Sequence, residues 1–322
     1  MIAASVTSFH PDRPVAGLTV GEVDEAPPPD GWVTVTVTAA SLNHHDLWSL
    51  KGVGLREEQL PMVLGTDAAA VDDEGNEYVV HAVIGDPAAG GGDETLDPKR
   101  SLLSERHNGT LAQRLTVPTR NLVAKPAELS AAEAACVPTA WLTAYRMLTT
   151  RGQVQAGETV LVQGAGGGVS TAAIVLAKTL GARVWVTSRD EARRDHALQL
   201  GADAAFESGA RLPERVDAVL ESVGEATWSH SLKALRPGGR IVVCGATSGA
   251  APSADLNRVF FLQLSVIGST MGTREELEAV LALMVGAGLR PQIDSTFALT
   301  DAASAVERLA TGAAFGKIVV TP

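Results

Sequence analysis

The sequence predicts an α/β protein in two domains, a β-rich first domain and a second domain built on a parallel sheet. Five short apolar segments between residues 160 and 268 alternate with helical segments, which is typical of a parallel sheet covered by helices. The first 120 residues instead carry strand patterns without this alternation. The 322 residues, 45% of them hydrophobic and 20% charged, are enough to build two buried cores.

Two strands are expected in the first domain. Residues 32–38 alternate Val with Thr at period two, and residues 77–84 form a second largely apolar run. The segments 27–31 and 72–76 are rich in Pro, Gly, Asp and Asn, so they predict turns.

The second domain opens with a glycine-rich loop between a strand and a helix. The apolar strand 160–163 leads into glycines at 164 and 166–168, then a helix at 171–180 and a second strand at 183–187. A helix N-terminus offers unpaired N–H groups and partial positive charge, and glycines let phosphates approach the backbone. This context predicts dinucleotide binding rather than a purely structural turn. We assign the motif as Ala165-x-Gly167-x-x-Ser170, because Val169 at the last position would crowd the helix against the strand.

The residues after the second strand predict NADPH rather than NADH. Ser188 stands where NADH-binding proteins place an acidic ribose ligand, and Arg189, Arg193 and Arg194 follow it. Guanidinium groups favour a phosphate over a hydroxyl. Asp190 precedes a helical segment and is expected to cap it. The alternative is that these arginines only solvate a helix face.

The remaining elements extend this pattern. Segments 217–221, 239–244 and 264–268 complete the parallel sheet, 273–286 is an amphipathic helix, and the tail 315–320 is a strand that rejoins the first domain. Because the segment 264–268 is apolar and lies at the sheet edge, it predicts a homodimer.

Composition limits the partners. A net charge of -11 disfavours nucleic-acid binding, RNA included, which requires clustered positive charge. Cys136 and Cys244 are too few for a disulfide framework or a structural zinc site. The N-terminus lacks a basic flank and a long apolar region, and no run of about eighteen apolar residues occurs. We therefore expect a cytoplasmic protein that does not enter membranes.

Several segments together resemble the medium-chain dehydrogenase/reductase superfamily. They are Asn43-His44-His45-Asp46, residues 61–67, Glu133-Ala134-Ala135, Thr143-Ala144-Tyr145, the glycine loop, residues 235–240 and Gly316-Lys317. The resemblance implies a GroES-like β-barrel catalytic domain at 1–124 and 269–322, a Rossmann domain with a doubly wound parallel sheet at 125–268, and an active site in the cleft between them.

The positions that match the zinc ligands of this superfamily are Asn43, Thr66 and Thr139. An amide and two hydroxyls are not zinc ligands, so no metal is expected. Asp67 and His45 lie near in sequence and leave a makeshift site as an alternative. The four-cysteine lobe of many relatives is replaced by residues 85–108, which we expect to be a flexible loop.

Without zinc, plain alcohols and ketones are less favoured substrates than conjugated acceptors. The chain resembles the zinc-free quinone oxidoreductase and enoyl reductase branch, so we expect hydride transfer from NADPH to quinones, enones or enoyl esters. In this interpretation Asn43 donates to the substrate oxygen, His45 supplies the proton and Asp46 orients its neighbours. The alternatives are an alcohol or carbonyl dehydrogenase using NAD(P), and an NADPH-binding protein without turnover.

The expected cofactor site follows from the glycine loop and from the resemblance. Lys317 falls where relatives place a basic residue on the pyrophosphate, with a solvated lysine at a strand edge as the alternative. The cofactor-binding residues we expect are Thr143, Ala165, Gly166, Gly167, Gly168, Val169, Ser188, Arg189, Arg193, Val223, Gly245, Ser269 and Lys317.

Overall fold

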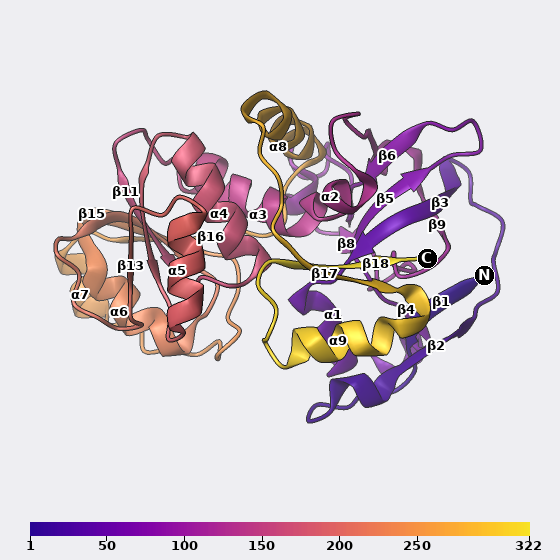
Figure 1. Cartoon of the computed structure of the whole chain (residues 1–322), viewed down its shortest axis with the longest axis horizontal. Coiled ribbons are helices and arrows are strands. Elements are labelled where there is room, and N and C mark those ends of the chain that lie inside the picture. Colours follow the sequence, from indigo (N-terminus) through magenta and orange to yellow (C-terminus); the bar gives the residue numbers. More distant parts are fainter. The chain divides into compact units, whose positions relative to one another are not determined.

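The computed structural model describes residues 1–322 and divides into two compact units (Figure 1). Unit 1 contains Met1–Leu142 and Met271–Pro322, and unit 2 contains Thr143–Thr270. Residues 125–142, expected in the nucleotide-binding domain, belong to unit 1. No helix combines the length and the apolar character that crossing a membrane requires.

Unit 2 is built on a six-stranded parallel sheet with the order β13-β12-β11-β14-β15-β16. Its strands are β11 (Thr159–Gln163), β12 (Arg183–Thr187), β13 (Ala204–Phe206), β14 (Val216–Glu221), β15 (Leu235–Val243) and β16 (Ser265–Gly268). The direction of strand succession reverses between β11 and β14, which is the switch point where doubly wound sheets bind ligands. The five expected strands are confirmed. The sequence analysis missed β13, which has only three residues, all partly exposed.

The helices of unit 2 begin after the strands. They are α4 (Gly168–Thr179), α5 (Glu191–Gln199), α6 (Glu225–Ala234) and α7 (Leu256–Phe261), with a π-helical turn η6 (Met147–Arg151). The helix α3 (Leu142–Arg146) spans the unit boundary. All five residues of β11 are buried, so this strand is apolar on both faces, as the central strand of a covered parallel sheet must be.

Unit 1 contains three sheets. A seven-stranded sheet has the order β10-β6-β5-β3-β18-β17, with β9 also paired to β3; a second sheet has the order β2-β1-β4; and β7 pairs with β8. The strands are β1 (Ile2–Val6), β2 (Leu18–Glu22), β3 (Trp32–Ser41), β4 (Met62–Val63), β5 (Asp67–Val71), β6 (Glu77–Val80), β7 (Val83–Ile84), β8 (Ser101–Leu102), β9 (Arg114–Pro118), β10 (Leu122–Ala124), β17 (Ile293–Ala298) and β18 (Lys317–Thr321).

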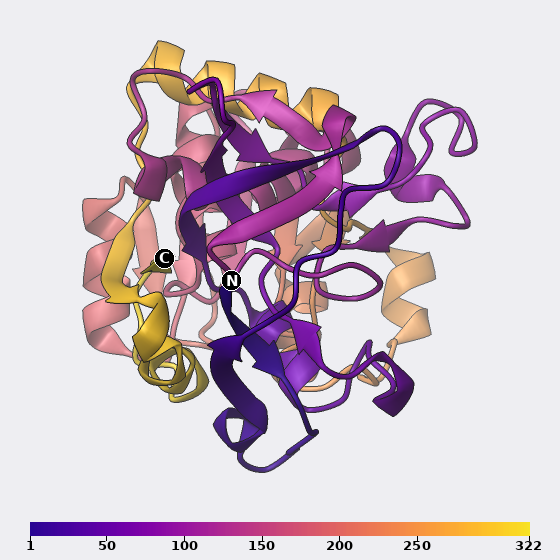
Figure 2. The ribbon, with the colours of Figure 1, turned by 90° about the vertical axis from the view of Figure 1, so that its right-hand side faces the viewer.

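The C-terminal strand returns to unit 1, so both chain ends lie there (Figure 2). Strand β18 pairs with β3 antiparallel and with β17 parallel, which confirms the expectation for the tail. The α-helices of unit 1 are α1 (His44–Leu50), α2 (Ala131–Ala135), α8 (Arg274–Ala287) and α9 (Ala302–Ala310). Its short helical turns are η1 (Pro14–Gly17), η2 (Glu57–Gln59), η3 (Glu94–Leu96), η4 (Thr119–Asn121), η5 (Val137–Trp141) and η7 (Leu299–Asp301).

The segment 77–84 is two strands, not the single strand expected. The chain breaks at His81, whose backbone N–H donates to Asn121 O at 2.8 Å. The Asn121 side-chain amide donates to His81 O at 2.7 Å and to Val83 O at 2.8 Å. The Asn121 side chain therefore satisfies backbone carbonyls that would otherwise pair with a neighbouring strand. An apolar sequence pattern does not reveal such a distant partner.

The segment 85–108 is anchored, in contrast to the flexible loop expected. Glu94 is fully buried, its Oε1 lies 3.2 Å from His81 Nε2, and it accepts from the Arg274 backbone N–H at 2.7 Å. Burial alone would raise the pKa of the Glu94 carboxyl, but these hydrogen bonds lower it to about 2. Asp93 caps η3 beside it.

Candidate active site

Four of the residues singled out in the sequence meet at one end of the large sheet of unit 1. Ser41, the last residue of β3, pairs with Asp67 of β5 and with Val319 of β18. Because both neighbours run antiparallel to β3, their first residues lie beside its end. Asn43, Thr66, Asp67 and Lys317 are thereby brought together.

Lys317 occupies the centre of this cluster. Its side chain is 3% exposed, and its Nζ donates to Leu42 O at 2.7 Å, Asn43 Oδ1 at 2.5 Å and Asp67 Oδ2 at 3.0 Å. An ammonium group has three hydrogens, so all of them are used. In this structure the charge of Lys317 is directed to Asp67 inside unit 1, and its role at the pyrophosphate stays a prediction.

Asn43 is oriented by this ammonium group. Since Nζ can only donate, it must face the amide oxygen, and the amide nitrogen then points the other way. The Asn43 Nδ2 donates to Thr66 Oγ1 at 3.1 Å and to Asp67 Oδ2 at 2.9 Å. Both amide hydrogens are thus committed within the protein. The donation from Asn43 to a substrate oxygen, expected from the sequence, does not fit this arrangement.

Two threonine hydroxyls continue the cluster. Thr66 Oγ1 lies 3.0 Å from Thr139 Oγ1. Thr66 is 1% exposed, whereas Thr139 is partly exposed. Thr139 lies in the π-helical turn η5, directly after Pro138. Such turns are frequent at functional sites, and proline has no N–H to continue an α-helix. Sequence reasoning noticed both threonines only as positions that lack zinc ligands.

Asp46 acts on the backbone around the cluster. It is fully buried; its Oδ2 accepts from Asn43 N at 2.8 Å and its Oδ1 from Gly65 N at 2.9 Å. Gly65 has φ +99°, and a Cβ there would lie 2.4 Å from Thr110 Oγ1. Burial raises the pKa of the Asp46 carboxyl. With both oxygens bound to the backbone, Asp46 holds Asn43 and the turn before Thr66 in position.

His45 is a titratable side chain beside the cluster that reaches solvent. Its side chain is 23% exposed and its Nε2 lies 3.2 Å from Glu105 Oε1. Burial lowers its pKa, but the hydrogen bond to Glu105 and the charges of Asp46, Glu105 and Asp67 outweigh this, so the pKa is raised. A raised pKa keeps more of the imidazole protonated near neutral pH.

In unit 2 the glycine loop lies at the switch point of the sheet. Gly164 has φ +81° and makes the turn, one residue before the motif we assigned. Gly167 precedes the first turn of α4, whose initial N–H groups have no intrahelical partner. Ser170 is 5% exposed and Val169 is partly exposed, so the small residue is the more buried of the two.

Arginine side chains surround the end of β12. A Cβ on Gly166 would lie 2.8 Å from Arg193 Nη1, so this guanidinium covers the glycine loop. The Asp190 side chain accepts from Arg193 N at 3.1 Å and caps α5, as expected. Arg194 Nη1 donates to Ser188 O at 2.7 Å, and Arg189 is exposed.

Comparisons with known proteins agree with this architecture. A model of the alcohol dehydrogenase GroES-like domain matches residues 29–127, and a model described as zinc-binding dehydrogenase matches residues 168–286. The chain is 30% identical over 323 residues to acryloyl-coenzyme A reductase of Metallosphaera sedula, covering 95% of this chain and 96% of the relative. It belongs to the medium-chain dehydrogenase/reductase superfamily.

Other relatives within this superfamily carry different names. Crotonyl-CoA carboxylase/reductase of Cereibacter sphaeroides is 29% identical, and the match covers 86% of this chain and 77% of the relative. A solved structure of an NAD-dependent alcohol dehydrogenase is 32% identical with a TM-score of 0.91 and covers 100% of both chains. The superfamily fold is therefore established, with a GroES-like domain and a Rossmann domain.

The zinc of the superfamily does not fit the residues present here. No three His, Cys, Asp or Glu side chains in the chain are grouped so as to hold a metal ion. Asp67 is bound by the Lys317 ammonium and His45 by Glu105, so the makeshift site considered from the sequence is already occupied by other partners. Burial raises the pKa of the nearby Cys136 thiol to about 12, so the thiol is protonated in the protein as it stands.

The remaining cofactor residues expected from the superfamily lie in unit 2. The Val223 N–H donates to Glu221 Oε1 at 2.8 Å, and its carbonyl accepts from Ser248. The Ser269 Oγ is buried and has no hydrogen-bond partner within the protein. Thr143 is 6% exposed, Ala165 is 2% exposed and Gly245 is partly exposed.

A buried polar network beneath these loops was missed by sequence reasoning. Glu221 accepts from Gly224 N and from the hydroxyls of Thr227 and Ser231. Ser231 Oγ in turn accepts from Gln163 Nε2 at 2.9 Å, linking the ends of β14 and β11. The sequence did contain a signal for this network, because Gln163 and Glu221 are single polar residues at the ends of apolar strands.

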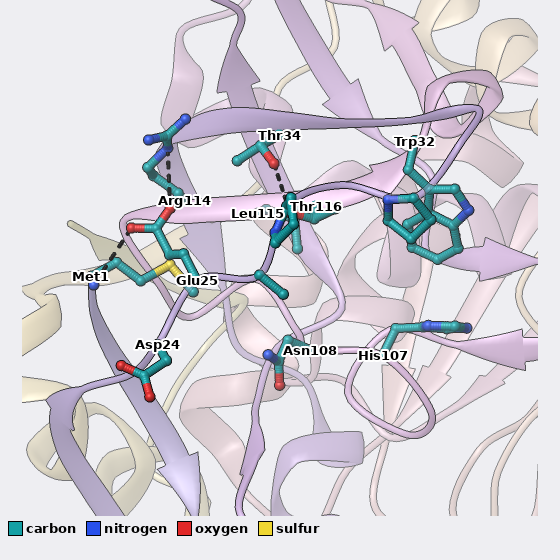
Figure 3. A pocket seen from close by; sticks show the side chains of 13 residues that line it. Met1, Asp24, Glu25, Trp32, Thr34, His107, Asn108, Arg114, Leu115 and Thr116 are labelled. Carbon is teal, nitrogen blue, oxygen red and sulfur yellow. Dashed lines mark hydrogen bonds and ion pairs between the residues drawn. The ribbon is translucent and has the colours of Figure 1, made fainter.

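A separate hollow of about 310 Å³ lies elsewhere in unit 1 (Figure 3). Trp32 and His107 line it, with ring centroids 4.9 Å apart, and Glu25 with Arg114 forms another part of its wall. Trp32 begins β3, whereas the candidate site follows the end of that strand. None of the expected catalytic residues lines this hollow.

Proposed function

We propose that this protein reduces carbon–carbon double bonds conjugated to a carbonyl, using NADPH. Enoyl thioesters such as coenzyme A esters are the foremost substrate class, and quinones and enones are the other acceptors considered. The observation that carries the proposal is that Asn43, Thr66 and Thr139, at the positions of the zinc ligands, are joined by hydrogen bonds to one another and to Lys317, so hydrogen-bonding groups stand there in place of metal ligands. The names of the acryloyl-CoA and crotonyl-CoA relatives support the substrate class.

The chemistry suits a site without a Lewis acid. NADPH supplies a hydride, which a conjugated acceptor takes at its β-carbon. Negative charge then develops on the carbonyl oxygen, where hydrogen-bond donors can stabilise it, and the α-carbon takes a proton. We assign proton supply to His45, whose raised pKa keeps it protonated, and assign Asp46 to positioning. A saturated ketone offers no such delocalisation and benefits more from a metal.

NADPH fits the groups around the glycine loop. The amides from Gly166 to Val169, which lie just before and at the start of α4, are suited to the pyrophosphate. Arg189 and Arg193 are suited to the 2′-phosphate, and Ser188 carries no charge that would repel it.

We further propose a homodimer formed through β16 and α7. Strand β16 lies at the sheet edge, and Val266 on it is 50% exposed. Large apolar side chains on α7 are exposed too: Leu256 at 69%, Phe260 at 64% and Phe261 at 78%. An unpaired apolar edge favours pairing with a second copy. Light scattering should give a dimer mass for the wild type and a monomer mass for Phe261→Glu; a monomeric wild type at micromolar concentration would contradict this.

A second candidate is an NAD(P)-dependent alcohol or carbonyl dehydrogenase. It is favoured by the 32% identity to the solved alcohol dehydrogenase over 100% of both chains. Binding of NADPH without turnover is a third outcome that the same experiment distinguishes.

The experiment is to follow deuterium from NADPH deuterated at the transferred position. With crotonyl-CoA, we expect butyryl-CoA carrying deuterium at the β-carbon, identified by mass spectrometry and NMR. The same experiment with crotonaldehyde offers both a conjugated double bond and a reducible carbonyl, and deuterium on its carbinol carbon would favour the carbonyl reductase. No deuterium in any product, with NADPH bound, would favour the non-catalytic protein.

A further inference from the structure

We propose that the Thr139 hydroxyl is the group that donates a hydrogen bond to the substrate's carbonyl oxygen. It stands at the end of a hydrogen-bond chain that begins at Lys317 and passes through Asn43 and Thr66. This inference rests on the proposed function and names the group that stabilises charge in that reaction.

The direction of the chain is fixed at its start. The Lys317 ammonium has hydrogens and no lone pair, so it donates to Asn43 Oδ1. The opposite side of the same amide, Nδ2, must then donate to Thr66 Oγ1. No reversed arrangement satisfies the lysine.

Burial fixes the next step. Thr66 Oγ1 has two polar neighbours, Asn43 Nδ2 and Thr139 Oγ1. If Thr139 donated to Thr66, the single hydrogen of Thr66 would be buried without an acceptor, at a cost of about 1–3 kcal/mol. Thr66 is 1% exposed, so water cannot replace that acceptor. Thr66 therefore donates to Thr139.

The consequence is one free hydrogen on the hydroxyl of Thr139, a residue that is partly exposed. Thr139 Oγ1 accepts from Thr66, and its own hydrogen has no acceptor within the protein. Each hydroxyl in a chain of aligned hydrogen bonds is polarised by the one before it, and here the chain starts at a buried positive charge. A donor of this kind is suited to an oxygen that becomes negative during reaction.

The test compares Thr139→Val, which keeps the shape and loses the hydroxyl, with Thr139→Ser, which keeps the hydroxyl. With crotonyl-CoA and NADPH, we expect Thr139→Val to lower kcat by about 100-fold, the usual effect of removing one oxyanion donor, with a smaller change in KM. Thr139→Ser should stay within a few-fold of the wild type. Unchanged NADPH binding, followed by its fluorescence, shows that the variants are folded.

A second measurement is independent of turnover. The thioester carbonyl stretch of bound crotonyl-CoA, recorded by Raman difference spectroscopy, should lie at lower frequency in the wild type and in Thr139→Ser than in Thr139→Val. Equal kcat values, or equal stretches in all three proteins, would overturn the assignment. If the wild type binds crotonyl-CoA and NADPH without turnover, the proposed function fails, and the stretch still decides the role of Thr139.

Discussion

At the scale of single residues, the candidate site is organised by one buried positive charge. Lys317 satisfies a carbonyl, an amide oxygen and a carboxylate that would otherwise lie in the protein without this donor. Asp67 balances the charge, and Ser41 also donates to it at 2.9 Å. Such a cluster is held together only while both charges are present.

Removing the lysine should destabilise the protein. Lys317→Met leaves the Asp67 carboxylate buried and unpaired, at a cost of about 3–5 kcal/mol in the free energy of unfolding. Adding Asp67→Asn to the same chain should recover part of the loss, because the unpaired charge is gone. Urea unfolding followed by circular dichroism measures both. A Lys317→Met protein as stable as the wild type would contradict the cluster described here.

Glu105 should set the pH dependence of turnover through His45. The hydrogen bond and charge of Glu105 help to raise the His45 pKa, so Glu105→Gln should lower it. If protonated His45 supplies the proton, activity falls as pH rises through this pKa. The falling limb of the kcat/KM profile should therefore move to lower pH in Glu105→Gln. An unmoved limb, or a His45→Ala variant with an unchanged profile, would assign proton supply to another group.

Part of this site could be predicted from the sequence, because the types of residue at a few positions are enough to suggest their chemistry. Asn43 and Asp46 were recognised, and the loss of zinc ligands was read from Asn43, Thr66 and Thr139. The position of Lys317 was not, since its partners Leu42 and Asp67 are more than two hundred residues away in the chain. The role of Thr139 depends on burial and hydrogen-bond direction, which no sequence pattern encodes.

At the scale of secondary-structure elements, cofactor selectivity belongs to the turn between β12 and α5. Ser188→Asp places a carboxylate near the expected 2′-phosphate and should shift preference toward NADH. Arg193→Ala should raise the KM for NADPH by about tenfold or more and change that for NADH little. Arg211→Ala, an exposed arginine elsewhere in unit 2, is the control. Unchanged NADPH/NADH ratios in both test variants would refute the assignment.

The loop at 85–108 should owe its order to Glu94. The pKa of this carboxyl is lowered from 4.5 to about 2, so its contribution is present above about pH 4.5 and is lost as pH falls toward 2. Glu94→Gln should cost about 1–3 kcal/mol at pH 7. The stability difference from the wild type, measured by urea unfolding, should shrink at pH 3. A difference that is equal at both pH values would show that the charge of Glu94 is not what matters.

Helices and strands were predicted best where a long periodic or apolar sequence pattern indicates them. The sheet strands of unit 2 and the helix α8 follow such patterns. In unit 1 only β3, the pair β6 and β7, and β18 were expected; its other strands were missed, as was β13 in unit 2. The break at His81 was missed as well, because a distant Asn121 imposes it. A turn that is stabilised by a side chain from a distant part of the sequence cannot be predicted from the residues of the turn itself.

At the scale of the whole molecule, the sequence predicted two units and the return of the C-terminal strand to the first. The family models support the same two domains. The sequence pattern did not show that residues 125–142 belong to unit 1. They belong there because short helices such as α2 pack on β3 and β5 rather than on the parallel sheet.

The central claim is that a lysine-centred hydrogen-bond cluster takes the place of zinc and restricts the chemistry to conjugated acceptors. The most direct test is NADPH consumption, with a chelator present, on a matched pair: a conjugated enone and the corresponding saturated ketone. We predict turnover of the conjugated member alone, unaffected by the chelator. Turnover of the saturated ketone, or loss of all activity on chelation, would contradict the account.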